Sequence, residues 1–399
     1  MSNIDDNSRS YYCSMKFKFL KIDLESKTTY NCHAAKPHTV NFDWLKHNRG
    51  QLFNTPTNVD ERLQMLANQR NASCEQNCWK AEDIGAVSPR LFQNGINQTH
   101  SESVTRPEII DLTIGPDCNL TCSYCCKEYS TAWRRDIVNN GNYNIEFDDG
   151  RFQASNMDRL LLKISQPELK NTQPYQELLD EIKLAAPTLK KLIITGGEPF
   201  LDNRLLEIVE QVSLAPLTEL EIYTGLGVTL TRFTNIISKL SKISNLTLIV
   251  SAENTKKFLE FNRYGIQYLE FVEKINLLKA AGIKLNFHST ITNLTIFGFN
   301  EFYQEFSDTK INLTFAYQPY IMSPHILDVA SKEQITKDIV NLPESMQTQI
   351  LKSINQAPTE TERNNIKSFV QEFAKRRALD VTIFPMSFLK WMELDYVVQ

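Results

Sequence analysis

Six apolar runs, separated by segments with helical periodicity, dominate the sequence between residues 106 and about 320. The runs are IIDLTIG, KKLIITG, ELEIYTG, LTLIVSAE, KLNFHSTI and INLTFAYQPY, and stretches such as YLEFVEKINLLKAAG lie between them. Strands that alternate with helices pair in parallel through right-handed crossovers. The sequence therefore predicts an α/β fold with a partial (β/α)6 TIM-like barrel over 106–320, whose chemistry lies on loops at the carboxyl ends of the strands.

Two further segments flank the predicted barrel. Residues 1–105 combine strand-like runs such as MKFKFLKID with the helical stretch NVDERLQMLANQ, and we expect a small cysteine-rich α+β domain there. Residues 321–399 contain the helix-like stretches SKEQITKDIV and ETERNNIKSFVQEFAKRR, so a helical C-terminal extension is expected. The first crossover of the barrel is long, and its NNGNYNIEFDDG stretch is expected to belong to an insertion.

The composition argues against several classes of protein. The chain has 399 residues, of which 42% are hydrophobic, and its formal net charge of -4 comes from scattered acidic and basic residues. No nucleic-acid-binding face and no polybasic membrane anchor is indicated. The N-terminus is polar and acidic, and no run approaches the roughly 20 apolar residues of a membrane span. We therefore expect a cytoplasmic protein without a membrane partner.

The eight cysteines fall into two groups. One group follows the first barrel strand in the stretch DLTIGPDCNLTCSYCC: Cys118, Cys122, Cys125 and Cys126. The other group lies within the first 80 residues: Cys13, Cys32, Cys74 and Cys78. In a reducing cytosol, cysteines grouped in this way are more often metal ligands or catalytic groups than disulfides.

The C-x3-C-x2-C spacing of Cys118, Cys122 and Cys125 suits an iron–sulfur cluster. Three thiolates ligate three irons of a 4Fe-4S cluster and leave the fourth iron open, whereas a closed structural zinc site takes four ligands. An open iron implies that another molecule binds there. A zinc site with Cys126 as its fourth ligand is the alternative, but the neighbouring Cys125 and Cys126 would point in divergent directions.

These three cysteines, with Tyr124 before the last of them, resemble the signature loop of radical S-adenosylmethionine (SAM) enzymes. The second barrel strand ends in TGGEP (Thr195 to Pro199), which resembles the motif of that family for the SAM amino group. Because the two motifs end successive strands of one predicted barrel, the joint match is specific. The resemblance covers roughly residues 106–320.

The resemblance implies a 4Fe-4S cluster whose open iron binds the amino and carboxylate groups of SAM. An electron from a donor such as flavodoxin or ferredoxin, passed on by the reduced cluster, then cleaves SAM to a 5′-deoxyadenosyl radical that removes a substrate hydrogen. The cluster ligands Cys118, Cys122 and Cys125 are thereby also the catalytic residues. The cofactor-binding residues that the resemblance implies are Tyr124, Gly196, Gly197, Glu198, Pro199, Ser251 and Arg263.

Several of these residues have a specific expected role. The two glycines let the backbone approach the cofactor closely, and the Glu198 carboxylate can accept a hydrogen bond from the SAM ammonium group. By the family pattern, Ser251 and Arg263 would bind the SAM ribose or carboxylate, although an ordinary surface arginine is the alternative for Arg263. The third strand ends in YTGLG rather than NTNG, and the fourth in SAEN rather than SxDG, which leaves Thr224 and Glu253 open as cofactor contacts.

The four N-terminal cysteines predict a second metal site. Cys13 and Cys32 bracket a predicted hairpin, and the other two stand in CEQNCWKAEDIGAVSPR. This arrangement resembles the auxiliary 4Fe-4S domain of the N-terminal-twitch radical SAM group, whose loop after the cluster cysteines also carries serine and tryptophan, as Ser130 and Trp133 do here. A zinc site with the same four ligands is the less favoured alternative, because four thiolates also suit Zn(II).

The substrate is less constrained by the sequence. His288, Gln318 and Tyr320 lie at barrel positions that can face a substrate, although a structural histidine is the alternative for His288. The predicted auxiliary domain favours oxidative modification of a peptide or protein side chain. Radical dehydrogenation or rearrangement of a small molecule or sugar is one alternative, and a non-catalytic iron–sulfur or zinc binding protein is another.

Overall fold

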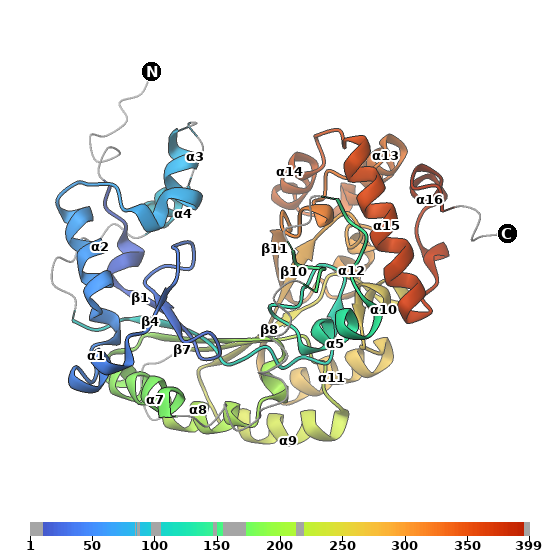
Figure 1. Cartoon of the computed structure of the whole chain (residues 1–399). Helices are drawn as coiled ribbons and strands as arrows, with labels where there is room; N and C mark the ends of the chain where they lie inside the picture. Colours follow the sequence, from blue (N-terminus) through green and yellow to red (C-terminus); the bar gives the residue numbers. More distant parts are fainter. Residues whose placement is uncertain are drawn as a thin grey trace. The chain divides into compact units, whose positions relative to one another are not determined.

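The computed structural model describes residues 11–83, 85, 88–96, 105–146, 150–154, 173–212 and 219–394. The chain folds into two compact units (Figure 1). The first unit comprises Met1–Gly115, Pro167–Thr195 and Asn203–Glu221. The second comprises Pro116–Gln166, Gly196–Asp202 and Ile222–Gln399.

The elements of the first unit come from three stretches of the chain. Its strands are β1 (Phe19–Asp23), β2 (Thr28–Tyr30), β3 (His38–Thr39), β4 (Ile109–Thr113) and β6 (Lys191–Thr195). Its helices are α1 (Phe42–His47), α2 (Pro56–Leu66), α3 (Lys80–Asp83), α4 (Pro89–Ile96), α7 (Gln173–Ala185) and α8 (Arg204–Val212). Short 3-10 turns lie at Ser14–Phe17, Leu52–Asn54, Ala72–Cys74 and Ala186–Thr188, and a π-helical turn lies at Glu75–Trp79.

The sheet of the first unit has the strand order β6-β4-β1-β2-β3. Strand β4 pairs in parallel with β6 on one side and with β1 on the other, while β1, β2 and β3 form an antiparallel meander. The predicted hairpin is thus confirmed, with Cys13 and Cys32 just outside its two strands. Its first strand, β1, also extends the parallel sheet by pairing with β4. In this pairing Ile22 lies opposite Leu112, and both side chains are buried.

The second unit holds most of the helices. Its strands are β5 (Thr121–Cys122), β8 (Leu246–Ser251), β9 (Arg263–Tyr264), β10 (Lys284–Ile291) and β11 (Lys310–Phe315), and β7 (Glu219–Thr224) begins in the first unit and ends in the second. Its helices are α5 (Thr131–Asn140), α9 (Leu230–Leu240), α10 (Lys256–Asn262), α11 (Tyr268–Ala280), α12 (Phe299–Glu305), α13 (Val329–Asp338), α14 (Glu344–Ser353), α15 (Glu360–Arg377) and α16 (Met386–Trp391). Short 3-10 turns lie at Pro199–Leu201, Tyr320–Met322, Ile339–Asn341 and Val381–Ile383.

Strands β8, β10 and β11 are the parallel core of the second unit. Strand β10 pairs in parallel with β8 and with β11, and the end of β7 lies beside β8. Because these strands run in the same direction, the loops that follow them leave from one edge. A separate two-stranded antiparallel sheet joins β5 to β9.

All six predicted barrel runs form strands, and the prediction of an α/β fold with a parallel sheet is confirmed. Among the described residues, the strand orders end at β3 in the first unit and at β11 in the second, so these strands form no closed barrel. The helices α13–α16 occupy the predicted helical extension. The domain boundaries at 105 and 320 stay predictions.

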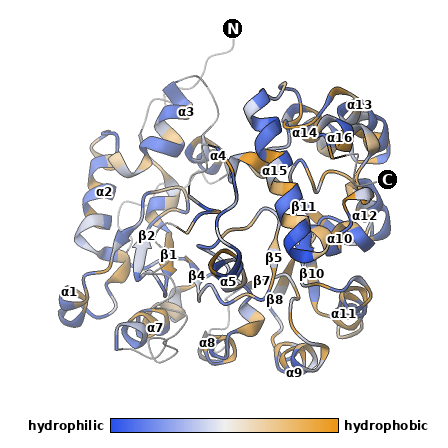
Figure 2. Cartoon of the chain, turned by 45° about the vertical axis from the view of Figure 1, so that its right-hand side comes forward, coloured by the Kyte–Doolittle hydropathy of each residue, from blue (hydrophilic) through white to orange (hydrophobic). Residues whose placement is uncertain are grey.

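Helices of the core bury the side on which their apolar residues recur every three or four positions. In Figure 2, helices α8 and α9 carry apolar and polar residues on different sides. The apolar side of α9 is buried through Phe233, Ile236, Ile237 and Leu240, which follow a spacing of three or four residues. None of the helices in the described ranges is long and apolar enough to cross a membrane.

Candidate functional site

The loop after β4 carries the predicted cluster cysteines. Cys118 and Cys122 are buried and Cys125 is half-buried, and all three are free thiols. Ser130 anchors the loop, because its hydroxyl donates to the Leu120 carbonyl at 2.8 Å and caps α5. Trp133, inside α5, donates its indole N–H to the Cys122 carbonyl at 3.0 Å. The serine and tryptophan noted in the sequence therefore fix the backbone of the cysteine loop.

These thiols are shielded from water. Burial raises the pKa of Cys118 to about 12 and the pKa of Cys122 to about 11, and the neighbouring sulfur adds to the rise at Cys118. Burial also raises the pKa of Cys125 well above its usual value. A metal ligand must be a thiolate, so a bound cationic group has to supply the charge that displaces these protons. Two buried thiols and one half-buried thiol on one loop fit an iron–sulfur cluster in this respect.

Arg263 lies directly beside the cysteine loop. It is the register partner of Cys122 in the β5–β9 ladder, and its Nη1 lies 3.9 Å from the Cys122 sulfur. The rest of its guanidinium binds Glu253 through two hydrogen bonds of 3.0 and 2.9 Å. The hydroxyl of Tyr124 donates to the same carboxylate at 3.0 Å. The structure thus joins the predicted residues Tyr124, Cys122 and Arg263 through Glu253, for which the sequence left a cofactor contact open.

The TGGEP loop after β6 packs against the cysteine loop. A Cβ atom on Gly197 would lie 2.6 Å from the Pro116 carbonyl oxygen and 2.7 Å from that of Asp117. The backbone N–H of Glu198 donates to the Asp117 carbonyl at 2.7 Å. Only glycine permits this approach, so the two motifs that were joined by resemblance are also in contact.

Glu198 is buried, and its carboxylate accepts hydrogen bonds within the protein. One oxygen accepts from Thr224 Oγ1 at 2.7 Å and from the Phe200 N–H at 3.1 Å. The other accepts from the N–H groups of Gly225 and Gly227 at 2.9 and 3.2 Å. These contacts tie the TGGEP loop to the loop after β7, and they give Thr224 a place in the site. Direct contact of Glu198 with SAM stays a prediction.

The two glycines of YTGLG and Gly265 share a partner that the sequence did not reveal. Cβ atoms on Gly227 and Gly265 would each lie 2.9 Å from the side chain of Leu120, and one on Gly225 would lie 3.2 Å from it. Leu120 stands between Cys118 and Cys122, so these glycines make room for the middle of the cysteine loop. The unusual glycine spacing is the signal that would have identified this packing.

The remaining predicted cofactor residues are placed by the strands. Ser251 ends β8 and lies opposite His288 in the ladder with β10. Gly196 directly follows β6, and Pro199 begins the 3-10 turn Pro199–Leu201. Binding of SAM by these residues stays a prediction. His288 is bonded to Thr314 Oγ1 at 3.2 Å, and burial, followed by the Arg263 charge, lowers its pKa.

The four N-terminal cysteines lie together in the first unit. They belong to one buried cluster with Met15, Phe19 and Trp79: Cys13, Cys32, Cys74 and Cys78. All four are free thiols. Burial raises the pKa of each thiol, that of Cys13 to about 12. The residues predicted to share a second metal site are therefore close in space.

Two buried polar side chains beside these cysteines lack partners. Ser14 Oγ and both amide atoms of Asn31 have no hydrogen-bond partner among the residues that the structure describes. They adjoin Cys13 and Cys32 in the chain, and an orphaned buried polar group is costly. A polar group bound between the cysteines fits this environment. Among the described residues, no three Cys, His, Asp or Glu side chains are arranged to hold a single metal ion. The four thiolates of a 4Fe-4S cluster bind four different irons, so they need not converge on one point.

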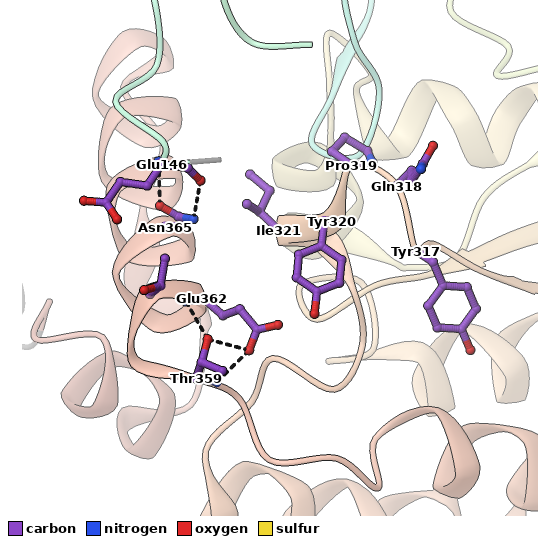
Figure 3. Close-up of a pocket in the computed structure, with 10 residues that line it drawn as sticks. Glu146, Tyr317, Gln318, Pro319, Tyr320, Ile321, Thr359, Glu362 and Asn365 are labelled. Carbon is purple, nitrogen blue, oxygen red and sulfur yellow. Dashed lines mark hydrogen bonds between the residues drawn. The ribbon is translucent and has the colours of Figure 1, made fainter. Parts of the chain in front are cut away.

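Gln318 and Tyr320, predicted near the substrate, line a pocket of about 390 Å³ in the second unit. Its walls are the loop after β11 and the start of α15, where Thr359 and Glu362 face Tyr320 (Figure 3). Arg151 connects the pocket to the cysteine loop, since its guanidinium donates to Gln318 Oε1 at 2.9 Å and lies 3.7 Å from the Cys126 sulfur.

One basic residue of α15 belongs to the site region and was missed. Arg377 donates to Thr121 Oγ1 at 2.9 Å and to the hydroxyl of Tyr143 at 2.9 Å. Its guanidinium also lies 5.0 Å from the centre of the Trp133 ring. The KRR run that ends the helix resembles a solvated helix end, so its sequence gave no sign that one arginine is buried.

The fold and the loop geometry define a class of α/β proteins that carry a cysteine-rich loop at the carboxyl end of a parallel strand. Residues 112–310 match the family model of the radical SAM superfamily, and the chain belongs to this superfamily. No curated protein matches the chain.

Solved structures of radical SAM proteins resemble the chain only distantly. Native anSMEcpe with bound AdoMet is 16% identical over 52% of this chain and 50% of that chain, with a TM-score of 0.32. Streptococcus suis SuiB bound to the precursor peptide SuiA is 15% identical over 60% of this chain and 46% of that chain, with a TM-score of 0.33. The chain thus spans about half the length of these two proteins. The likeness to the N-terminal-twitch group stays a prediction.

Proposed function

We propose that the protein cleaves SAM reductively and uses the resulting radical to remove a hydrogen atom from a peptide or protein side chain. The cleavage of SAM is supported above all by the contact of Gly197 and Glu198 with the backbone of Pro116 and Asp117. It brings the motif predicted to bind the SAM amino group against the loop that holds the cluster cysteines. Superfamily membership supports the same reading.

Each residue has a defined task in this proposal. Cys118, Cys122 and Cys125 hold the 4Fe-4S cluster, which supplies the electron for SAM cleavage when bound. Arg263 keeps a positive charge beside Cys122, fixed in place by Glu253. Gly196 and Pro199 would shape the loop that holds the methionine part of SAM, and Ser251 would bind its ribose or carboxylate. The electron comes from a donor such as flavodoxin or ferredoxin in the cytoplasm.

A second 4Fe-4S cluster is proposed at Cys13, Cys32, Cys74 and Cys78. Its support is the joint burial of four free thiols beside orphaned polar side chains. With four cysteine ligands, this cluster has no open iron, so it serves electron transfer or structural support. Electron transfer from the substrate radical would make the reaction oxidative, which is the outcome that we favour.

The substrate is proposed to enter near the loop after β11. The side chains of Tyr317 and Tyr320 are exposed, each with 57% of its surface accessible. Tyr320 and Gln318 line the pocket beside Glu362. Exposed aromatic and amide groups beside a pocket suit a peptide chain. A small molecule or sugar is the alternative substrate.

The proposed reaction is tested by anaerobic reconstitution with iron and sulfide, followed by reduction in the presence of SAM. We expect release of 5′-deoxyadenosine, quantified by liquid chromatography. A protein that carries the cluster but releases none would be a binding protein rather than an enzyme of this kind.

A further inference from the structure

Lys16 is a buried cation in the cysteine-rich part of the first unit. It lies in the 3-10 turn Ser14–Phe17, which follows Cys13, and its side chain has 0% exposure. A buried ammonium group is costly unless it is paired, and its Nζ is paired with the carboxylate of Glu61. The chain therefore keeps an ion pair where an apolar side chain would pack at lower cost.

A short path of polar contacts joins Lys16 to Cys74. The Nζ atom donates to Ser73 Oγ at 3.0 Å, and this hydroxyl lies 3.9 Å from the Cys74 sulfur. The same hydroxyl donates to the side chain of Asn71 at 2.6 Å, which fixes its orientation. Lys16 is thus held close to one of the four sulfurs by contacts on both sides.

The charge of Lys16 acts on two cysteines. Burial raises the pKa of Cys32 and of Cys74, and the positive charge of Lys16 opposes this rise at both thiols. Arg90 has a similar effect on Cys78, but Glu82 binds its guanidinium at 3.0 and 2.6 Å, and it also donates to the Tyr12 carbonyl. Lys16 in turn has a contact path to the Cys74 sulfur through Ser73.

We propose that Lys16 is a positioning residue of the second cluster, a fixed positive charge that stabilises its reduced state and so raises its reduction potential. The inference rests on the second cluster of the proposed function. Reduction adds one electron to a buried anionic group, and a cation nearby favours the more negative state. Ser73, which accepts from Lys16 and lies beside Cys74, holds the ammonium group close to this sulfur.

The test is an anaerobic redox titration followed by electron paramagnetic resonance. The parent is the full-length chain with Cys118→Ala, Cys122→Ala and Cys125→Ala, so that only the N-terminal site can hold a cluster. Lys16→Met should shift the midpoint potential to a more negative value. Glu61→Gln removes the opposing charge and should shift it to a more positive value, whereas Lys16→Arg should leave it near that of the parent.

The outcomes separate the two claims. Shifts of opposite sign for Lys16→Met and Glu61→Gln support the inference. A full cluster signal with an unmoved potential in Lys16→Met overturns the role of Lys16 and leaves the second cluster intact. A parent without any 4Fe-4S signal overturns the second cluster itself. If circular dichroism shows that Lys16→Met is unfolded, Glu61→Gln decides, because an unmoved or more negative potential then contradicts the inference.

Discussion

Cys122 and Arg263 are opposite each other in the short ladder between β5 and β9, although they lie 141 positions apart in the chain. Backbone pairing brings a cluster cysteine next to a buried guanidinium, and Glu253 then orients that group with two hydrogen bonds. The ladder therefore determines the electrostatic surroundings of the cysteine loop, because it brings the cation to the sulfur.

Replacing Arg263 should destabilise this region strongly. Arg263→Met leaves the Glu253 carboxylate, which has 0% exposure, without its main partner. Breaking a buried ion pair in this way costs about 3–5 kcal/mol of unfolding free energy. Urea denaturation of the cluster-free protein measures the loss. Asp308→Asn is the control, since its exposed pair with Lys279 should contribute about 1 kcal/mol or less. Equal effects of the two substitutions would contradict the buried role.

A methyl group at Gly197 should separate the two loops of the site. The added Cβ would meet backbone oxygens at 2.6 and 2.7 Å, so Gly197→Ala should cost roughly 1–3 kcal/mol and lower the yield of reconstituted cluster. Gly95→Ala is a matched control, because, apart from the backbone of its own helix, no atom of the described residues lies within 4 Å of the added group. Full cluster yield in Gly197→Ala would show that the loops do not need this contact.

Two tryptophans form a matched pair, one at each cysteine site. Trp133 donates its indole N–H to the Cys122 carbonyl at 3.0 Å, and Trp79 donates to the Asn71 carbonyl at 2.7 Å. Each change to Phe should cost about 1–3 kcal/mol, because a buried carbonyl loses its donor. Trp133→Phe should weaken retention of the SAM-binding cluster, and Trp79→Phe that of the second cluster. Iron analysis with cluster spectroscopy distinguishes them, and a reversed pattern would refute the assignment.

Acid should destabilise the start of α15 through Glu362. Burial raises the pKa of Glu362, but hydrogen bonds with Tyr320, Thr359 and His325 outweigh this effect and bring it to about 2. The unfolded chain therefore takes up a proton before the folded one, and stability falls as the pH decreases from about 4.5 towards 2. Urea unfolding at several pH values should show a flatter profile for Glu362→Gln. Parallel profiles for the two proteins would contradict this pKa.

The strands and both motifs were predictable because they depend on local patterns. Apolar runs that alternate with helix-period segments indicate the strands. C-x3-C-x2-C is recognised by the spacing of its cysteines, and GGEP by its consecutive residues. Pairing over long sequence distances is not local, so the extension of the sheet by β1 and the ladder at Arg263 were unforeseen. Burial of a charge also leaves no local trace, so the sequence did not reveal that Lys16 and Arg377 are buried. The four N-terminal cysteines lie in one buried cluster, and their sharing of a second metal site stays a prediction.

The most direct test compares the unmodified protein with the triple variant Cys118→Ala, Cys122→Ala, Cys125→Ala after identical anaerobic reconstitution. Iron content and 5′-deoxyadenosine release are measured on the same samples. We predict that the unmodified protein cleaves SAM, and that the triple variant releases no 5′-deoxyadenosine while it keeps about half of the iron, at the N-terminal site. SAM cleavage that persists in the triple variant would contradict the assignment of these cysteines as the ligands of the reactive cluster.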